Sequence, residues 1–426
     1  MTIQELHTLF LQYPKLSTDT RAININSLFF ALKGDNFNGN KFAKEAIEKG
    51  AKFAVISDSK YKLSESYIVV EDALKTLQAL AKYHRDQLNI PIIGITGSNG
   101  KTTTKELIKR TLSQKYKTFA THGNLNNNIG VPLSLLSINE KHEIAIIEMG
   151  ANHQKEIDFL ANICNPNCGL ITNIGKAHLE GFGGIEGVEK GKVELFQNLS
   201  SRNKQVFINV DDVRLKNYVE KLKAITYGTN DCEYKGEIIS NSPFLSINVK
   251  YKKNEFEVNS NLIGTYNFSN ILSAVVIGDY FDVSPVEIKK GIENYFPKNN
   301  RSQLVCQGSN KIIMDAYNAN PSSMAEAIKN LVKSKAENKY FVLGDMLELG
   351  GESEFEHKNI VEILQKENLK GILVGKEFMK YNTSEYLVFE TNQEAKDYLK
   401  ENKKENTLYL IKGSRGIKLE TVQEVL

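Results

Sequence analysis

The sequence predicts an α/β protein of three domains: a small N-terminal α/β domain, a central domain with a mostly parallel sheet, and a C-terminal Rossmann-like domain. First, the chain has 426 residues, enough for about three domains at ~150 residues each. Second, short apolar runs alternate with helical stretches, as in α/β proteins. Third, this alternation starts afresh near residue 298. We therefore expect domains at 1–88, 89–297 and 298–426.

Short strands and helices alternate in the predicted N-terminal domain. The runs 27–32, 53–56 and 67–70 read as strands. Helical patterning covers 41–49 and 73–88. The residues that follow, up to Pro91, make a plausible domain boundary.

The central segment opens with the apolar run 92–96, which reads as a short buried strand, and a helical pattern over 102–114. The continuous apolar runs 144–147 and 169–172 suit parallel strands that are covered on both faces. Residues 244–258 alternate around a polar turn, which predicts a hairpin appended to the sheet.

The last domain repeats this pattern on a smaller scale. Strand-like runs, separated by helical stretches, lie at 311–314, 340–343, 371–374 and 408–411. The alternation predicts a second, smaller doubly wound sheet.

The composition excludes several classes of protein. Lys and Arg total 54 and Asp and Glu total 51, a formal charge of +3, which is too small an excess for a dedicated nucleic-acid binder. No stretch approaches about eighteen consecutive apolar residues, and the N-terminus does not read as a secretory signal. We therefore expect a cytoplasmic protein with no nucleic-acid or membrane partner.

The four cysteines are Cys164, Cys168, Cys232 and Cys306. They are too few for a disulfide framework and suit a reducing compartment. Cys164 and Cys168 are four positions apart, but the residues between them read as a turn and no second Cys/His pair lies nearby. We expect buried or loop thiols there rather than a metal site.

A glycine-rich loop joins the predicted strand 92–96 to the helix that follows it. The loop residues are Gly97, Ser98, Asn99, Gly100, Lys101, Thr102 and Thr103. Backbone N–H groups of such a loop hold phosphate oxygens, Lys101 can reach the β- and γ-phosphates, and the Thr102 hydroxyl can bind Mg²⁺. The general template has another glycine where this chain has Ile95. A plain glycine-rich turn is the alternative, but the flanking strand and helix favour a nucleotide-binding P-loop domain.

Three further residues are placed beyond strands of the predicted central sheet. Glu148 directly follows the run 144–147, at the strand end that borders the ligand crevice of a parallel sheet, and it can hold a metal bound to the phosphates. His178 lies in the loop after the next strand, and Lys192 lies in a helical stretch. Composition alone leaves these two as a loop histidine and a solvated lysine.

The segment 124–132 is unusually rich in amide side chains. Asx hydrogen bonds within a turn explain this composition. Donors presented to a phosphate or a peptide, Asn128 among them, explain it equally well.

Together these motifs resemble the Mur ligases of peptidoglycan synthesis. The resemblance rests on the segments 97–103, 148–151, 173–180 and 191–192. Further segments resemble the branch of this family that joins D-alanyl-D-alanine to UDP-N-acetylmuramoyl-tripeptide, namely 19–21, 28–34, 123–132, 315–321, 343–350 and 412–415. The resemblance spans all three predicted domains.

The resemblance implies a monomeric, ATP-dependent ligase of cell wall biogenesis, and hence a role in cell shape and cell division. A substrate carboxylate would take the γ-phosphoryl group of ATP, and an amine would attack the acyl phosphate. Two Mg²⁺ ions are implied. Thr102 and Glu148 would hold the first ion, and His178 and a carbamylated Lys192 the second. With Lys101, the last two are the implied catalytic residues.

The resemblance also implies binding residues. Asn267, Asn270, Arg301 and Asp315 would bind the nucleotide beside the phosphate loop, although the two asparagines also suit a helix cap. The implied substrate-binding residues are Thr20, Arg21, Phe30, Asn128, Tyr317, Asn318, Asn320, Ser414 and Arg415. Because ATP would be held by two domains, domain closure is implied. The sequence departs from the family pattern at Thr20, Asn40 and Tyr266.

Other classes stay open on the sequence alone. Another ligase of the superfamily, such as the one adding the third peptide residue or folylpolyglutamate synthase, would lack the segments 315–321 and 343–350. A nucleotide-dependent switch or motor ATPase would leave His178 and Lys192 without roles. A non-catalytic scaffold would not need Lys101. The sequence also leaves open lysine or diaminopimelate as the third residue of the acceptor peptide.

Overall fold

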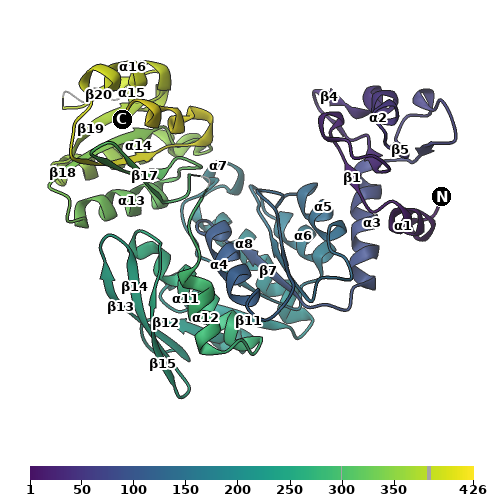
Figure 1. Cartoon of the computed structure of the whole chain (residues 1–426), viewed down its shortest axis with the longest axis horizontal. Coiled ribbons are helices and arrows are strands. Elements are labelled where there is room, and N and C mark those ends of the chain that lie inside the picture. Colours follow the sequence, from purple (N-terminus) through teal and green to yellow (C-terminus); the bar gives the residue numbers. More distant parts are fainter. Residues whose placement is uncertain (299, 381–384) are drawn as a thin grey trace.

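The computed structural model describes residues 1–298, 300–380 and 385–426. They form three α/β domains, each built around its own sheet, which confirms the predicted fold class. Figure 1 shows the N-terminal and C-terminal domains on different sides of the central domain, far from each other. Within these described ranges, every helix is too short or too polar to cross a membrane.

Four parallel strands form the N-terminal sheet, in the order β1-β2-β5-β6. Their bounds are β1 (Leu16–Ser17), β2 (Leu28–Phe30), β5 (Phe53–Ile56) and β6 (Tyr67–Val69). The other elements are helices α1 (Ile3–Gln12) and α2 (Ala43–Glu48) and a ribbon of β3 (Lys33–Gly34) and β4 (Phe37–Asn38). The three strands and the first helix predicted here are confirmed.

Helix α3 (Ala73–Gln87) ties the N-terminal domain to the central domain. Asp72 caps it by accepting hydrogen bonds from two backbone N–H groups of the first turn. The helix packs against α5 (Gly130–Leu136) and α6 (Glu156–Cys164) of the central domain (Figure 1). The buried Arg85 guanidinium donates to backbone carbonyls at the end of α6. This predicted helix is therefore confirmed, and it is packed into both domains.

Nine strands form the central sheet, in the order β15-β14-β13-β12-β11-β10-β7-β9-β8. The strands that pair in parallel are β7 (Ile92–Thr96), β8 (Thr118–Ala120), β9 (Ile144–Glu148), β10 (Cys168–Ile171), β11 (Gln205–Asn209), β12 (Ile225–Gly228) and β13 (Tyr234–Asn241). Antiparallel β14 (Leu245–Tyr251) and β15 (Asn254–Asn259) extend the sheet, which confirms the predicted hairpin.

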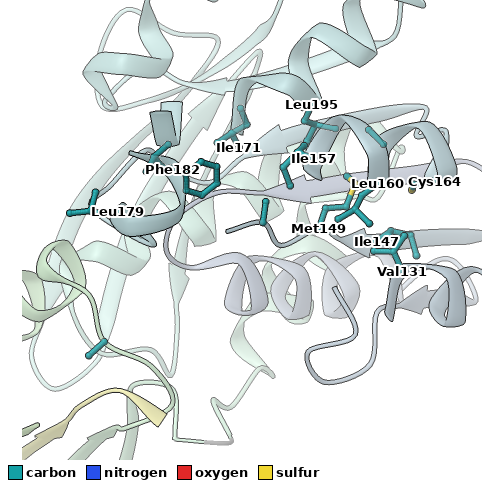
Figure 2. Close-up of a cluster of buried hydrophobic side chains, with 14 of the residues drawn as sticks. Val131, Ile147, Met149, Ile157, Leu160, Cys164, Ile171, Leu179, Phe182 and Leu195 are labelled. Atoms are coloured by element: carbon teal, nitrogen blue, oxygen red, sulfur yellow. The ribbon is translucent and has the colours of Figure 1, made fainter. Parts of the chain in front are cut away.

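Helices cover both faces of this sheet, which is why its inner strands read as continuous apolar runs. On one face, Ile147 of β9 packs with side chains of α6 and α8 (Ile185–Ser201). Figure 2 shows Ile147 with Met149, Leu160 and Leu195 in this cluster. The cluster holds the end of β9 in place beside the P-loop strand β7.

The opposite face carries the alternate side chains of the same strands. Ile146 of β9 packs there in a cluster with residues of α4 (Lys101–Leu112), α11 (Phe268–Tyr280) and α12 (Pro285–Glu293). Because β7 and β9 are parallel neighbours, their carboxyl ends lie at the same sheet edge. The glycine-rich loop and Glu148 are therefore brought together there.

Six strands form the C-terminal sheet, in the order β16-β17-β21-β18-β19-β20, with only the edge strand β16 antiparallel. Their bounds are β16 (Gln303–Gln307), β17 (Asn310–Asp315), β18 (Asn338–Gly344), β19 (Lys370–Val374), β20 (Leu387–Phe389) and β21 (Thr407–Lys412). Helices α13 (Pro321–Lys333) and α14 (Ser353–Lys366) cover one face, and α16 (Asn392–Asn402) covers the other. The predicted doubly wound sheet and its four predicted strands are confirmed.

Candidate active site

A cavity of about 1200 Å³ opens in the central domain, and residues of α3 and of the C-terminal domain complete its walls. Its walls include Gln78 of α3, the loop residues 98–103, Glu148, His178 and Asp315. All but Gln78 lie at or after the carboxyl ends of parallel strands, where α/β sheets bind their ligands. The cavity is therefore the candidate active site.

Two glycines give the loop after β7 its shape. Gly97 and Gly100 have φ angles of 140° and 78°, which L side chains rarely adopt. A Cβ on Gly97 would lie 2.0 Å from Thr172 Oγ1, and a Cβ on Gly100 would lie 2.7 Å from Asn270 Oδ1. Both positions therefore require glycine, for conformation and for space.

The loop that follows β10 supports the glycine-rich loop from behind. Ser98 Oγ donates to the Gly175 carbonyl at 2.9 Å, and the Asn99 N–H donates to Asn173 Oδ1 at 3.0 Å. Thr172 Oγ1 donates to the Asn99 carbonyl at 2.6 Å. The loop is thus held in shape by the protein itself, which lowers the entropy lost when a ligand binds.

Lys101 folds back onto the loop that precedes it. Its Nζ donates to the carbonyls of Gly97 at 2.6 Å and Ser98 at 3.2 Å. Burial lowers the pKa of Lys101, the Glu148 carboxylate opposes that shift, and Arg301 adds to it. The amine is therefore held at the loop, within reach of an anion bound there.

Thr102 and Glu148, predicted to hold the first metal ion, meet at the cavity wall. The Thr102 hydroxyl donates to Glu148 Oε2 at 3.0 Å, and Asn126 Nδ2 donates to Oε1 at 2.9 Å. Hydroxyl and carboxylate oxygens are ligands that Mg²⁺ prefers. Within the described residues, no three His, Cys, Asp or Glu side chains form a group that could hold a metal. An ion at Glu148 would therefore also need oxygen atoms from a bound substrate.

Sequence reasoning missed Lys105, which lies directly behind Glu148. Its side chain is fully buried, its Nζ donates to the Thr121 carbonyl at 2.6 Å, and the same nitrogen lies 3.6 Å from Glu148 Oε2. The available signal was its spacing from Lys101 and Thr102, because residues three and four apart share a helix face.

Lys192 lies behind the cavity wall and does not line the cavity itself. Its side chain is buried, its Nζ donates to the Ala151 carbonyl at 3.1 Å, and it lies 4.9 Å from the centroid of the Phe182 ring. Burial, followed by repulsion from Lys101, lowers the pKa of Lys192 well below its ordinary value, although nearby carboxylates oppose this. The amine loses its proton more readily than an exposed lysine.

His178 lines the cavity and contacts the C-terminal domain. Its Nδ1 is hydrogen-bonded to Glu348 Oε2. That hydrogen bond lowers the pKa of Glu348, and burial opposes the shift. Ala151, which accepts the Lys192 hydrogen bond, lines the same cavity as His178.

Asn267 and Asn270 also line the cavity, next to the glycine-rich loop. Asn270 Nδ2 donates to Asn267 Oδ1 at 2.8 Å, and Asn270 Oδ1 accepts from the Thr104 hydroxyl at 3.0 Å. Asn267 precedes α11, but its side chain makes no capping hydrogen bond to that helix. The pair instead braces α11 against α4.

The C-terminal domain places Asp315 and Arg301 in the cavity wall. Asp315 Oδ1 accepts from the Ser302 N–H at 2.9 Å, and Oδ2 accepts from Lys412 Nζ at 2.6 Å. The Arg301 guanidinium lies 3.6 Å from the centroid of the Tyr317 ring. Asp315 and Arg301 are thus each held in place by other residues of the C-terminal domain, and the sequence did not predict these contacts.

The predicted substrate-binding residues divide into two groups. Those that line the cavity are Asn128, Tyr317, Asn318 and Asn320. Asn320 Nδ2 also donates to Asn99 Oδ1 at 2.7 Å, which joins the C-terminal domain to the phosphate loop. Those that do not line it are Thr20, Arg21, Phe30, Ser414 and Arg415.

The residues of the second group have different surroundings. Arg21 is exposed and forms an ion pair with Asp19 at 2.6 Å. The side chain of Phe30 is fully buried in the core, so it presents no surface to a ligand. Ser414 is buried and accepts a backbone hydrogen bond, and the Arg415 guanidinium lies 5.3 Å from the centroid of Tyr317. Arg415 is thus beside the cavity wall.

Two positions that depart from the family pattern have structural partners. Asn40 is buried and exchanges hydrogen bonds with Ser57, whose N–H donates to Asn40 Oδ1 at 2.8 Å. The Tyr266 hydroxyl is hydrogen-bonded to Ser302 Oγ at 2.7 Å, which links the central and C-terminal domains. The two thiols Cys164 and Cys168 are both buried, and burial raises the pKa of Cys164 to about 12.

Models of known protein families match consecutive parts of the chain. The model for the Mur ligase family, catalytic domain, matches residues 13–94. The Mur ligase middle domain matches residues 95–278, and the Mur ligase, glutamate ligase domain, matches residues 300–415. Together these matches cover most of the chain.

Similar proteins cover nearly its whole length. UDP-N-acetylmuramoyl-tripeptide--D-alanyl-D-alanine ligase from Bacillus subtilis is 34% identical over 96% of this chain and 92% of its own. The enzyme of the same name from Escherichia coli is 31% identical over 99% and 95%.

Solved structures give the same result. A crystal structure of MurF from Acinetobacter baumannii has a TM-score of 0.88 at 30% identity, covering 96% of this chain and 92% of that one. The MurF ligase from Thermotoga maritima, in complex with ADP, has a TM-score of 0.85 at 25% identity and covers 97% of each chain.

Proposed function

Because the chain belongs to the Mur ligase family, we propose that it uses ATP to join D-alanyl-D-alanine to UDP-N-acetylmuramoyl-tripeptide in peptidoglycan precursor synthesis. The family resemblance inferred from the motifs is thereby confirmed. One observation supports the activity most: a P-loop, the Thr102–Glu148 pair and His178 line a single cavity, with Lys192 directly behind its wall.

The reaction needs a better leaving group than a carboxylate offers. The tripeptide carboxylate takes the γ-phosphoryl group of ATP, and ADP leaves. The amine of the dipeptide then attacks the carbonyl carbon of the acyl phosphate. The bond from that carbon to the phosphate oxygen breaks, so that the amide forms while inorganic phosphate and the proton of the amine are released. Little covalent chemistry is asked of the protein, whose task is to position the reactants and balance their charge.

The P-loop fits a nucleotide phosphate. Gly97 and Gly100 have positive φ angles and leave no room for a Cβ beside Thr172 and Asn270, and a tight glycine-rich loop before a helix can present backbone N–H groups to phosphate oxygens. Lys101 lies against this loop and would pair with the phosphates, and Arg301, which lines the same cavity from the C-terminal domain, would approach them. Asn267, Asn270 and Asp315 would border the rest of the nucleotide.

The residues present also fit magnesium. Mg²⁺ bound to ATP would neutralise the negative charge of the phosphate oxygens, including the charge that develops during phosphoryl transfer. Thr102 and Glu148 would hold a first ion, since their oxygens already lie within 3.0 Å of each other at the cavity wall. His178 and Lys192 would hold a second ion next to the acceptor carboxylate.

Lys192 would serve a metal only after carbamylation, which turns an amine into a carboxylate-like group. A neutral amine attacks carbon dioxide, and one proton is released as the carbamate forms. The lowered pKa of Lys192 favours that neutral amine. Its position beside Ala151, a residue of the cavity wall, would bring a carbamate to the substrates.

The two substrates would bind to different domains. The UDP-sugar would contact Thr20 and Arg21 in the N-terminal domain, and its peptide would pass Asn128 at the cavity wall. The dipeptide would lie against the C-terminal domain at Tyr317, Asn318, Asn320, Ser414 and Arg415. The guanidinium of Arg415 suits the dipeptide carboxylate. All these groups belong to one chain, which supports a monomer, and the need for ATP supports a cytoplasmic site of action.

A substrate panel tests this function. Phosphate release by the purified protein with ATP and Mg²⁺ is expected to require both UDP-N-acetylmuramoyl-tripeptide and D-alanyl-D-alanine. Omission of either substrate should abolish the signal. Equal turnover with a free diamino acid in place of the dipeptide would contradict the assignment, and turnover without any carboxylate acceptor would indicate a plain ATPase.

A further inference from the structure

The C-terminal domain makes several contacts with the loop that carries His178. His178 Nδ1 is hydrogen-bonded to Glu348, and Lys176 Nζ lies 2.5 Å from Glu356 Oε1. The Lys176 N–H also donates to Ser322 Oγ at 2.9 Å. Three residues of the C-terminal domain therefore contact the three-residue stretch 176–178 of the central domain, of which His178 lines the cavity.

Only one of these contacts touches a residue of the proposed metal site. The backbone of both partners is in the left-handed region, with φ of 52° at His178 and 64° at Glu348. Such conformations in residues other than glycine persist where surrounding contacts impose them, and they are frequent at functional sites. The backbone N–H of Glu180 also donates to the Glu348 carbonyl at 3.4 Å, so the two segments meet through main chain and side chain.

We propose that Glu348 is a positioning residue that fixes the ring orientation and tautomer of His178, so that the second metal site is complete only when the C-terminal domain is docked. The inference rests on the proposed function. It assigns a task to the segment 343–350, which the proposed chemistry leaves without one.

The hydrogen bond with Glu348 determines which ring nitrogen of His178 carries the proton. An ionised carboxylate can only accept a hydrogen bond, so the hydrogen on the His178 ring must lie on Nδ1. In the neutral ring, which is the form that binds a metal, Nε2 then keeps its lone pair, and among the described residues no hydrogen bond uses that atom. A histidine that donates one ring N–H to a carboxylate and binds metal through the other nitrogen is a recurring arrangement in metal sites.

Domain closure and chemistry would be coupled by this contact. With the C-terminal domain undocked, His178 would lose its partner, and its ring would be free to rotate or to change tautomer. The second ion would then bind weakly until the domain that holds the dipeptide has closed. Phosphoryl transfer before the amine arrives would thus be restrained.

The first test reads the tautomer directly. In the full chain labelled with ¹⁵N-histidine, the ring of His178, assigned with His178→Gln, should carry its proton on Nδ1. In Glu348→Ala the proton should shift toward Nε2, and Glu356→Gln should leave the spectrum unchanged. An Nε2–H tautomer in the unmodified protein would overturn the proposal.

The second test reads the ion. Mn²⁺ binding is measured by electron paramagnetic resonance with a non-hydrolysable ATP analogue and the UDP-tripeptide. Glu348→Ala should lower the affinity for the second, weaker-binding Mn²⁺ ion by about 10- to 100-fold. The affinities for the first ion and for the nucleotide should stay unchanged. Glu348→Gln, which still accepts a hydrogen bond, should show a smaller loss.

The Glu356→Gln variant separates positioning from docking. It removes the Lys176 ion pair but not the His178 contact. Equal Mn²⁺ losses in Glu356→Gln and Glu348→Ala, or no loss in Glu348→Ala, would overturn the proposal. If the unmodified protein bound no second ion at all, the two-ion form of the proposed function would fail instead.

Discussion

Lys105 Nζ lies 3.6 Å from Glu148 Oε2, and the two side chains are 0% and 2% exposed. A buried charge of this kind is costly once its partner is removed, about 3–5 kcal/mol in known cases. The pair therefore links the stability of the central domain to the carboxylate proposed to hold magnesium.

We predict that Lys105→Met lowers the free energy of unfolding by about 3 kcal/mol, because Glu148 would stay buried without its cation. Urea denaturation followed by circular dichroism measures this. Glu106→Gln is the matched control, since Glu106 also contacts Lys105, at 3.3 Å, but is part-exposed. Its loss should stay below about 1 kcal/mol. Equal effects in the two variants would contradict this account.

We predict that Gly100→Ala weakens ATP binding by roughly tenfold or more. The left-handed backbone alone costs about 1–2 kcal/mol for alanine, and tenfold in affinity corresponds to about 1.4 kcal/mol. The added Cβ would also press on Asn270. Calorimetric titration with an ATP analogue measures the change. Gly351→Ala, where a Cβ meets open space, should bind normally.

We predict that Lys192→Ala lowers the rate of phosphate release by more than about 100-fold, the most that loss of a supporting residue usually costs at a metal site. Short carboxylic acids should restore part of the rate by filling the space of the carbamate. Lys190→Ala, on the exposed side of the same helix, should behave like the unmodified protein. Full activity of Lys192→Ala would contradict the proposed ligand role.

We predict that the protein loses stability as the pH falls from 7.5 to 5.5, through the pair of His7 and His84. Their rings are hydrogen-bonded at 3.0 Å, and His84 Nε2 is hydrogen-bonded to the Ile138 carbonyl of the central domain. Burial lowers the pKa of both histidines from 6.5. The unfolded chain therefore binds more protons below about pH 6.5, and acid favours unfolding.

Thermal melts across this pH range test the histidine pair. His84→Gln keeps a donor for the Ile138 carbonyl, and its melting temperature should fall less on acidification than that of the unmodified protein. His153→Gln, at an exposed position, should retain the full acid sensitivity. If the melting temperature of His84→Gln fell as steeply with decreasing pH as that of the unmodified protein, other groups would control the loss of stability in acid.

The regular elements were predictable because their signals are local. The apolar runs at 92–96 and 144–147 form β7 and β9, since a sheet covered on both faces needs apolar side chains in both directions. The domain to which a helix attaches is not a local property. Helix α3 looked like part of the N-terminal domain, yet Arg85 bonds to carbonyls about 80 positions away in α6 and its loop.

The site was predictable only where it is formed by residues that are close together in the sequence or that follow a known strand-end rule. Gly97 to Thr102 are consecutive, so their loop could be recognised, and Glu148 could be placed by the rule for strand ends. The partnership of His178 with Glu348 spans 170 positions, and no spacing rule announces it. Lys105 read as an ordinary helix lysine because burial against Glu148 depends on the folded sheet.

Transfer of the γ-phosphoryl group to the tripeptide carboxylate is the central step of the proposed reaction, and isotope labelling tests it directly. With ¹⁸O in that carboxylate, and with ATP, Mg²⁺ and D-alanyl-D-alanine present, one labelled oxygen should appear in the released phosphate for each amide formed. Amide formation with no ¹⁸O in the phosphate would contradict an acyl phosphate, and with it the proposed use of this cavity.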